Sequence, residues 1–279
     1  MMIPFELINL SLTSSRTRKA VICFSKVKSR FWVALGFTRN PFIHIKEHRR
    51  IGKTWGYSLS SDPFIVSTDS IFHAKIHKFS ESPIEDCMKW YESIKEVLGC
   101  QIDKVCVSNL LPSITDWLRM QQESIREVSI WGGRQEDFTY LFRNLRISEK
   151  FVLCMTSYEN NFQLEIPEGP SHLFIYTSKF INYDQLLKLK ARYITLDQSI
   201  LTNQEINGFL KSWMSCESHL DLKSFKINIS GPEAVNEIMD LPHEVGRYGY
   251  KIKRSDGKEA NVIFDRFVST CLFESSMNF

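Results

Sequence analysis

Apolar side chains recur along the chain at the two spacings that define helices and strands. Within residues 201–230, an apolar stripe at intervals of three and four residues predicts a helix. Its members are Ile206, Phe209, Leu210 and Trp213. Thr202 and Glu205 precede the stripe as a capping box, because hydroxyl and carboxylate can reciprocally satisfy free backbone amides. Alternating apolar residues at Phe225 and Ile227 then predict a short strand, so this stretch is a helix that leads into a strand.

The same succession of strand and helix occupies the preceding hundred or so residues. Strand-like runs recur at intervals of roughly 20 to 30 residues, the range of a leucine-rich-repeat array, with a helix candidate in most connections. The six runs span 104–108, 127–131, 151–156, 173–177, 193–197 and 224–230. No such unit can bury its own apolar face, so neighbouring units must stack. We therefore predict an α/β fold with an irregular leucine-rich-repeat-like βα array. An ordinary open parallel sheet is the alternative layering of the same elements.

The residues before this array predict a β region and a helix. Between residues 31 and 79, short runs of β-type residues alternate with Gly and Pro, which predicts a small antiparallel sheet or a set of hairpins. Ser82 and Glu85 form a second capping box, and Pro83 stands at the first helical position. The apolar stripe that follows predicts a helix that ends at Gly99.

Both ends of the chain carry shorter motifs. Residues 3–24 predict a small N-terminal helical piece in which Ser14 and Ser15 separate two apolar segments. The first segment is a cluster of Phe5, Leu7, Ile8, Leu10 and Leu12. Near the other end, the pair Asp256-Gly257 predicts the tight turn of a C-terminal β-hairpin, because Gly accepts the positive φ that such turns need.

Three of these segments resemble parts of one family. The residues Asn207, Phe209, Leu210 and Trp213, followed by Leu222 and a strand, look like the signature of the F-box-associated type 2 domain, which is found in a large nematode family of F-box proteins. The C-terminal hairpin is similar to the family's closing motif through Lys253, Arg254, Asp256, Gly257, Lys258 and Ala260. The N-terminal piece resembles the second half of an F-box, where a Pro-x-Glu-Leu helix is followed by a Ser- and Arg-rich turn and another helix.

The resemblance implies three parts and a function. Residues 1–30 would be a partial F-box, 31–80 a short-stranded β region, and 81–279 the F-box-associated type 2, leucine-rich-repeat-like domain. The first F-box helix would lie upstream of Met1, so we expect either a start that is too late or a weakened adaptor site. The implied function is the substrate-recognition subunit of a Skp–cullin–F-box ubiquitin ligase. Its partners would be a Skp-type adaptor, the cullin scaffold and an unknown protein target.

Two groups of residues are candidates for these contacts. The adaptor-binding candidates in the F-box remnant are Pro4, Phe5, Leu7, Ile8, Leu10 and Leu12. The target-binding candidates, on strands or at strand ends, are Trp131, Tyr158, Tyr176, Asp197 and Asn228. Aromatic residues commonly anchor protein interfaces, although the same residues also form cores. A helical hairpin that caps a sheet is the alternative interpretation of the N-terminal piece.

Composition and charge narrow the classes of partner. The net charge of +3, from 35 basic and 32 acidic residues, is too balanced to imply nucleic acid or an anionic membrane as an obligate partner. No apolar run approaches the roughly 20 residues of a membrane helix, and the N-terminus has no signal-peptide pattern. The seven cysteines are scattered without a CxxC, which indicates buried free thiols in a reducing compartment. We therefore expect a cytoplasmic or nuclear protein.

Motifs for catalysis are missing from the sequence. It contains no phosphate-binding glycine loop, no GxSxG and no HExxH, so we predict neither a cofactor nor enzymatic activity. His73 and His77 are spaced like metal ligands on a helix, but the surrounding residues favour a strand, and a third ligand is missing nearby. A scaffold or decoy that has lost adaptor binding is the alternative function, and an uncharacterised enzyme ranks below it.

Overall fold

The structure, a computed structural model, is a mixed α/β fold, as predicted. It describes residues 2–26, 31–47, 53–64, 74–156, 158, 162–231, 233–247, 249–265 and 270–275. Fourteen strands and eight helices fall within these described residues. The chain divides into two compact units, Met1–Ile130 and Trp131–Phe279, which we call unit 1 and unit 2.

Unit 1 is built on six strands in the order β6-β5-β1-β2-β3-β4. Their bounds are β1 Phe31–Phe37, β2 Phe42–Glu47, β3 Thr54–Ser60, β4 Ala74–Phe79, β5 Gln101–Val107 and β6 Ser124–Ile130. β1, β2 and β3 are antiparallel, as predicted for this region, but β4 pairs in parallel with β3, which corrects the expectation of a wholly antiparallel sheet. The region is nevertheless not a separate sheet, because β1 pairs in parallel with β5, and β5 pairs in parallel with β6. The divisions expected at residues 30 and 80 therefore do not coincide with the division into units.

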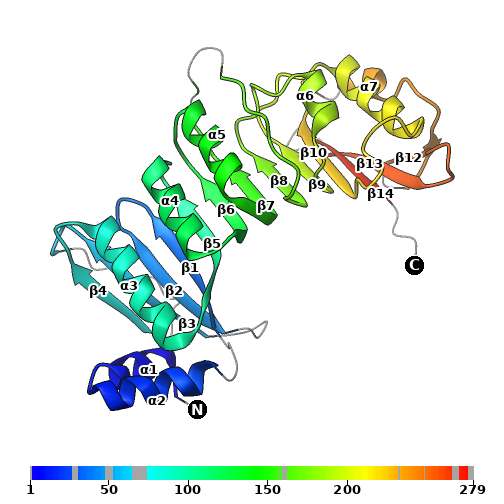
Figure 1. The fold of residues 1–279 in the computed structure, drawn as a ribbon. Coiled ribbons are helices and arrows are strands. Elements are labelled where there is room, and N and C mark those ends of the chain that lie inside the picture. The colour runs from blue at the N-terminus through cyan, green and yellow to red at the C-terminus, as the bar shows by residue number, and fades with distance from the viewer. Residues whose placement is uncertain are drawn as a thin grey trace. The chain divides into compact units, whose positions relative to one another are not determined.

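α3 and α4 lie over one face of this sheet, and α1 and α2 lie beside α3 at one end of it (Figure 1). Their bounds are α1 Pro4–Ser11, α2 Ser15–Lys26, α3 Pro83–Leu98 and α4 Pro112–Gln121. The compact helical piece predicted for residues 3–24 is thus confirmed as two helices. α3 packs on β2 and β3, and α1 and α2 pack against α3. Phe5 of α1 reaches the sheet, where its ring lies 4.9 Å from that of Tyr57.

The ends of α3 show one confirmed and one wrong prediction. Gly99 ends the helix with a positive φ of 62°, a conformation that glycine adopts without steric cost. The predicted capping box is wrong, because the Ser82 side chain makes no capping hydrogen bond. The Ser80 side chain makes the hydrogen bonds at this end of α3: its hydroxyl donates to Asp86 Oδ2 at 2.7 Å and accepts from the Ser82 amide at 3.1 Å.

Unit 2 contains eight strands in the order β11-β12-β13-β14-β10-β9-β8-β7. Their bounds are β7 Arg146–Leu153, β8 His172–Ile175, β9 Tyr193–Leu196, β10 Ser224–Asn228, β11 Glu244–Val245, β12 Tyr250–Lys253, β13 Glu259–Asp265 and β14 Thr270–Ser275. Its helices are α5 Gln135–Asn144, α6 Tyr183–Lys188, α7 Asn203–Met214 and α8 Ala234–Ile238. The strands β7 to β10 are mutually parallel. All six strands predicted between residues 104 and 230 are therefore present, as β5 to β10.

The C-terminal hairpin is confirmed, and the structure adds a strand to it. β12 and β13 pair antiparallel around Gly257, which has a φ of 92°. β14, which the sequence pattern did not predict, inserts between β13 and β10 and is antiparallel to both. It converts an isolated hairpin into part of the sheet of unit 2.

The core of unit 2 is centred on α7. Thr202 and Glu205 form the predicted capping box, with the Thr202 amide 2.7 Å from Glu205 Oε2 and the Glu205 amide 3.2 Å from Thr202 Oγ1. The four residues of the predicted stripe, Ile206, Phe209, Leu210 and Trp213, are fully buried. Asn207 is also buried, and its side-chain amide donates to the carbonyls of Ile238 and Asp240. This amide attaches the end of α8 to α7.

Candidate protein-interaction surface

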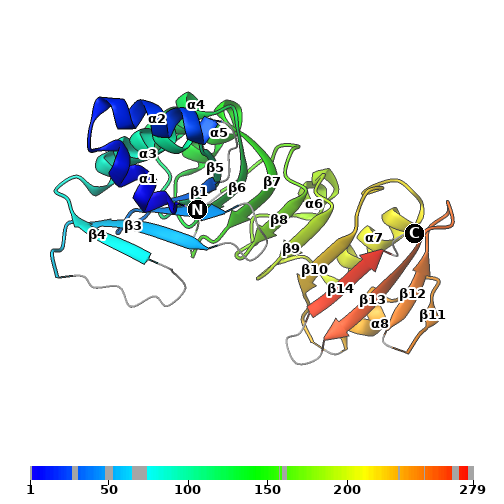
Figure 2. The same ribbon diagram turned by 90° about the horizontal axis from the view of Figure 1, so that it is seen from below.

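One face of the sheet in unit 2 is free of described helices. α5, α6 and α7 lie over the opposite face of β7 to β10 (Figures 1 and 2). The strand residues on the helix side are buried, as shown by Phe151, Leu173, Ile194 and Phe225. The residues between them alternate to the other side and remain partly exposed. We call that side of unit 2 the open face.

Strand register arranges the open face in rows that cross the strands. The middle row is mostly apolar and consists of Val152, Phe174, Thr195, Lys226, Leu272 and Ile263. The row beside it is mostly polar and consists of Lys150, His172, Tyr193, Ser224, Glu274 and Asn261. An apolar centre with a polar border is the usual anatomy of a protein interface.

Two close contacts order the side chains at one end of these rows. The rings of His172 and Tyr193 are stacked, with centroids 4.3 Å apart and planes 5° apart. Lys150 Nζ lies 4.5 Å from the ring centroid of Phe174. Each contact joins neighbouring strands, so these side chains are partly ordered before a partner arrives, which lowers the entropic cost of binding.

Three of the five target-binding candidates lie together. Tyr176, Asp197 and Asn228 form a third row at the carboxyl ends of β8, β9 and β10, as the register of these strands requires. Tyr176 is 49% exposed. Asn228 has a structural contact as well, since its Oδ1 accepts from the Ser199 amide at 2.6 Å.

The other two candidates are placed differently. Trp131 is exposed at the start of unit 2 but lies outside the three rows. Tyr158 belongs to an internal aromatic cluster: its ring contacts Phe162 and Phe180, and its hydroxyl donates to the Thr177 carbonyl. Burial raises the pKa of the Tyr158 hydroxyl. Tyr158 is therefore better explained as packing than as a contact for a target.

The adaptor-binding candidates divide between core and surface. Pro4, Phe5, Leu7 and Ile8 are buried within unit 1, so these four side chains are not available to a partner as folded. This corrects the expectation that the whole cluster is presented. Leu10 and Leu12 are 37% and 64% exposed, and adaptor binding stays a prediction for these two residues.

Sequence inspection missed most of the open face. Lys150, His172, Phe174 and Lys226 were not among the candidates, although each alternates with a buried residue on its strand. That alternation is the signal that could have found them. It was weak because β8 and β9 have only four residues each.

A polar hollow of about 580 Å³ lies at the amino ends of β8 to β10. Lys190, Arg192, Glu168 and Asp221 line it together with His219. Both ring nitrogens of His219 are buried, its ring packs edge-on against Phe209, and burial lowers its pKa to about 4. The hollow therefore mixes both signs of charge around a neutral imidazole.

Groups suited to metal or thiol chemistry are sparse. No set of three His, Cys, Asp or Glu residues that could hold a metal ion occurs in the part of the chain that the structure describes, and His73 of the spaced pair lies outside that part. All seven cysteines are free. Cys87, Cys100 and Cys271 are buried as expected, and burial raises the pKa of each to about 12, whereas Cys23 is exposed.

Within the described residues, no helix is long and apolar enough to cross a membrane.

Comparison with known proteins adds one match. Residues 161–227 match the sequence model of a family described as F-box associated. The matched stretch contains β8, α6, β9 and α7 and reaches into β10, and it thus includes the central strands of the open face. Neither the curated proteins nor the solved structures gave a match. The match supports an F-box-associated domain in unit 2.

Proposed function

We propose that this chain is the substrate-recognition subunit of a Skp–cullin–F-box ubiquitin ligase and that the open face of unit 2 binds the protein target. The observation that carries the proposal is the position of the F-box-associated match on the strands that form this face. The apolar middle row, the stacked pair of His172 and Tyr193 and the exposed Tyr176 supply the anchors that protein interfaces use.

In this role the chain performs no bond chemistry of its own. Its N-terminal helices would hold the adaptor while unit 2 holds the target near the ubiquitin donor, so that proximity accelerates transfer. We also propose that the protein is cytoplasmic or nuclear, because its cysteines are free and such a compartment keeps thiols reduced. We further propose that β5 to β10 form a leucine-rich-repeat-like array, because parallel strands succeed one another with intervening helices in most of the connections.

A scaffold or decoy without adaptor binding is the second candidate function. The burial of Phe5, Leu7 and Ile8 favours it, since these residues were the core of the expected adaptor site. Only Leu10 and Leu12 of that site remain on the surface. In this alternative the open face would still bind its protein target.

Two measurements on the full chain separate these functions. Retention of a purified Skp-type adaptor on the immobilised chain tests the ligase role, and failure to retain it would favour the scaffold. A photo-crosslinking amino acid at position 174 then tests the open face. Proteins captured there should lose ubiquitination when the chain is depleted.

The control for crosslinking is the same amino acid at position 120. Met120 is exposed on α4, far along the chain from the open face and in unit 1. Equal capture from positions 174 and 120 would show that the open face is not the target site.

A further inference from the structure

The polar hollow at the amino ends of β8 to β10 is formed by three connections of unit 2. Residues 168–171 precede β8, residues 189–192 join α6 to β9, and residues 217–222 join α7 to β10. The three connections lie side by side, because β8, β9 and β10 are neighbouring parallel strands. The hollow of about 580 Å³ falls within the range of small-molecule sites, which is roughly 300 to 1,000 Å³.

The sign of the charge alternates from one connection to the next. The first connection contributes Glu168, the middle one contributes Lys190 and Arg192, and the third contributes Glu217. All four side chains are exposed. Among the residues that the structure describes, none of these four side chains forms an ion pair. The two positive groups therefore lie between carboxylates that do not neutralise them by direct contact.

The third connection has a second carboxylate, which is already engaged. Asp221 interacts electrostatically with Arg254 and Lys258, and it raises the pKa of both. We therefore leave Asp221 out of the groups that are available to a ligand.

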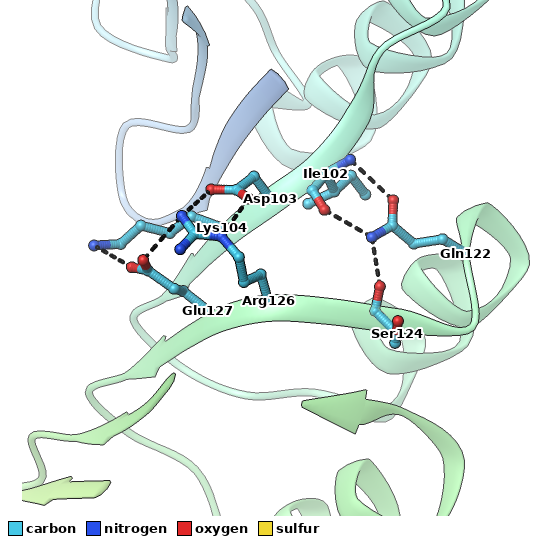
Figure 3. Close-up of polar contacts among 7 residues, drawn as sticks. All are labelled: Ile102, Asp103, Lys104, Gln122, Ser124, Arg126 and Glu127. Atoms are coloured by element: carbon cyan, nitrogen blue, oxygen red, sulfur yellow. Dashed lines mark hydrogen bonds and ion pairs between the residues drawn. The ribbon is translucent and has the colours of Figure 1, made fainter. Parts of the chain in front are cut away.

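Charged side chains on β5 and β6 of unit 1 show the opposite arrangement (Figure 3). Arg126 makes two contacts of 2.6 Å with the carboxylate of Asp103 and one of 3.1 Å with Glu127. Lys104 Nζ lies 3.6 Å from Glu127 Oε2. Each of these four groups has an oppositely charged neighbour, so the network leaves no charge for a ligand. The hollow of unit 2 has both signs of charge without this mutual pairing.

The backbone leading into the third connection is held in an unusual conformation. Cys216 and His219 have positive φ angles of 61° and 53°, which are uncommon for residues other than glycine. The His219 ring packs edge-on against Phe209, and the Glu217 amide donates to the Ser212 carbonyl at 3.0 Å. Such conformations persist only where packing imposes them, and they collect at ligand sites. The connection that carries Glu217 is thus ordered before a ligand arrives.

We propose that this hollow binds a small zwitterion of the class of a free amino acid or a dipeptide. Lys190 and Arg192 pair with its carboxylate, and the connections on either side offer Glu168 and Glu217 to its ammonium group. A simple anion meets repulsion from the two glutamates, and a simple cation meets repulsion from the two basic residues. A zwitterion avoids both. This ligand site does not depend on the ubiquitin-ligase function, since its tests use the chain alone.

Saturation-transfer NMR with the full chain tests this proposal. The probes are the twenty free amino acids and the twenty dipeptides that begin with glycine, and we expect at least one of them to bind. Its N-acetylated form lacks the ammonium group, and its amidated form lacks the carboxylate. Each capped form should bind at least about tenfold more weakly in titration calorimetry, because a charged hydrogen bond is lost. Absence of binding by every probe, or equal binding of the capped forms, would overturn the proposal.

Charge variants of the hollow give a second test. The double variant Lys190→Gln, Arg192→Gln should bind the zwitterion at least about tenfold more weakly and should now prefer the amidated form, because the repulsion of a cation is removed. The double variant Glu168→Gln, Glu217→Gln should show the opposite preference, for the N-acetylated form. Unchanged preferences in both variants would show that the probe binds elsewhere on the chain.

The matched control is the double variant Lys19→Gln, Lys179→Gln. These lysines are exposed on α2 and after β8 and do not line the hollow, so the net charge changes as in the Lys190→Gln, Arg192→Gln variant. The control should bind the zwitterion like the wild type, and all variants should melt at the same temperature without ligand. Equal loss of binding in the control would mean that net charge governs binding, which would overturn the proposal.

Discussion

Arg254 lies over Trp213, with its guanidinium carbon 5.2 Å from the ring centroid. The contact joins the β12–β13 hairpin to α7, two motifs that are separate in the sequence and that both carry the resemblance to F-box-associated domains. Arg254 is only 7% exposed. It also makes a two-pronged contact with Asp256 and donates to the Leu220 carbonyl at 2.9 Å. The Arg254 guanidinium lowers the pKa of the Asp256 carboxyl to about 2.

The Arg254→Met variant should therefore be less stable. It keeps much of the side-chain volume but loses the cation–π contact and the donor to Leu220, so we expect the free energy of unfolding to fall by about 2 kcal/mol. Urea unfolding at pH 7 measures this difference. The neighbouring Lys253→Met is the control, because Lys253 is exposed and should change stability by less than about 0.5 kcal/mol. Equal effects of the two variants would contradict a structural role of Arg254.

The open face gives a prediction about binding. The Phe174→Asp variant places a charge in the apolar middle row and should weaken target capture at least about tenfold, which is the range of interface anchors. Its stability should change little, since Phe174 is on the exposed side of β8. Capture is measured with the target identified by crosslinking, and unfolding is measured in parallel. Met120→Ala serves as the control for loss of an exposed apolar group. A loss of capture that tracks a loss of stability would mean that Phe174 acts through the fold.

Local patterns in the sequence predicted helices, strands and turns, but they did not predict which strands pair over long distances in the chain. The periodicity of α7, the capping pair of Thr202 and Glu205 and the turn at Gly257 depend on neighbouring residues, and each is confirmed. The pairing of β1 with β5 joins distant segments, and no local pattern specifies it. The pairing of β14 with β10 also joins distant segments, and no local pattern specifies it either. Periodicity therefore revealed which residues form elements but not how those elements combine.

The candidate site was predictable only in part. Tyr176, Asp197 and Asn228 meet in one row because they occupy equivalent positions at the ends of successive parallel strands. The apolar cluster at the N-terminus was misassigned in part, because a buried apolar side chain and an interface side chain have the same spacing on a helix. Leu7 and Leu12 differ in exposure only once α1 is packed against α3.

That difference gives a prediction for the N-terminal helices. Leu7→Asp should destabilise unit 1 severely, because an unpaired charge would enter a core position that is 2% exposed. Leu12→Asp should leave the free energy of unfolding nearly unchanged and should abolish retention of the Skp-type adaptor if the ligase role is correct. Thermal unfolding and adaptor pull-down of both variants measure the contrast. Normal adaptor retention by a folded Leu12→Asp variant would remove Leu12 from the adaptor site.

The last prediction concerns stability below neutral pH. His219 has a pKa of about 4 in the folded chain, because burial disfavours the charged imidazole. Its pKa in an unfolded chain is about 6.5, so the unfolded state takes up a proton first as the pH falls. His219 should therefore leave the protein's stability unaffected above about pH 6.5 and lower it progressively down to about pH 4. Between pH 7.5 and pH 5 this term amounts to about 2 kcal/mol.

The His219→Asn variant tests this term. Asn lacks a titrating group and tolerates the φ of 53° that His219 adopts. Urea unfolding at pH 7.5 and pH 5 should show that the wild type loses about 2 kcal/mol more than the variant does. His243→Asn is the control in the same unit, because it makes the same replacement at an exposed histidine. If the wild type and the His219→Asn variant lose the same free energy on acidification, the imidazole is solvated in the folded chain and the hollow that it lines is open to water.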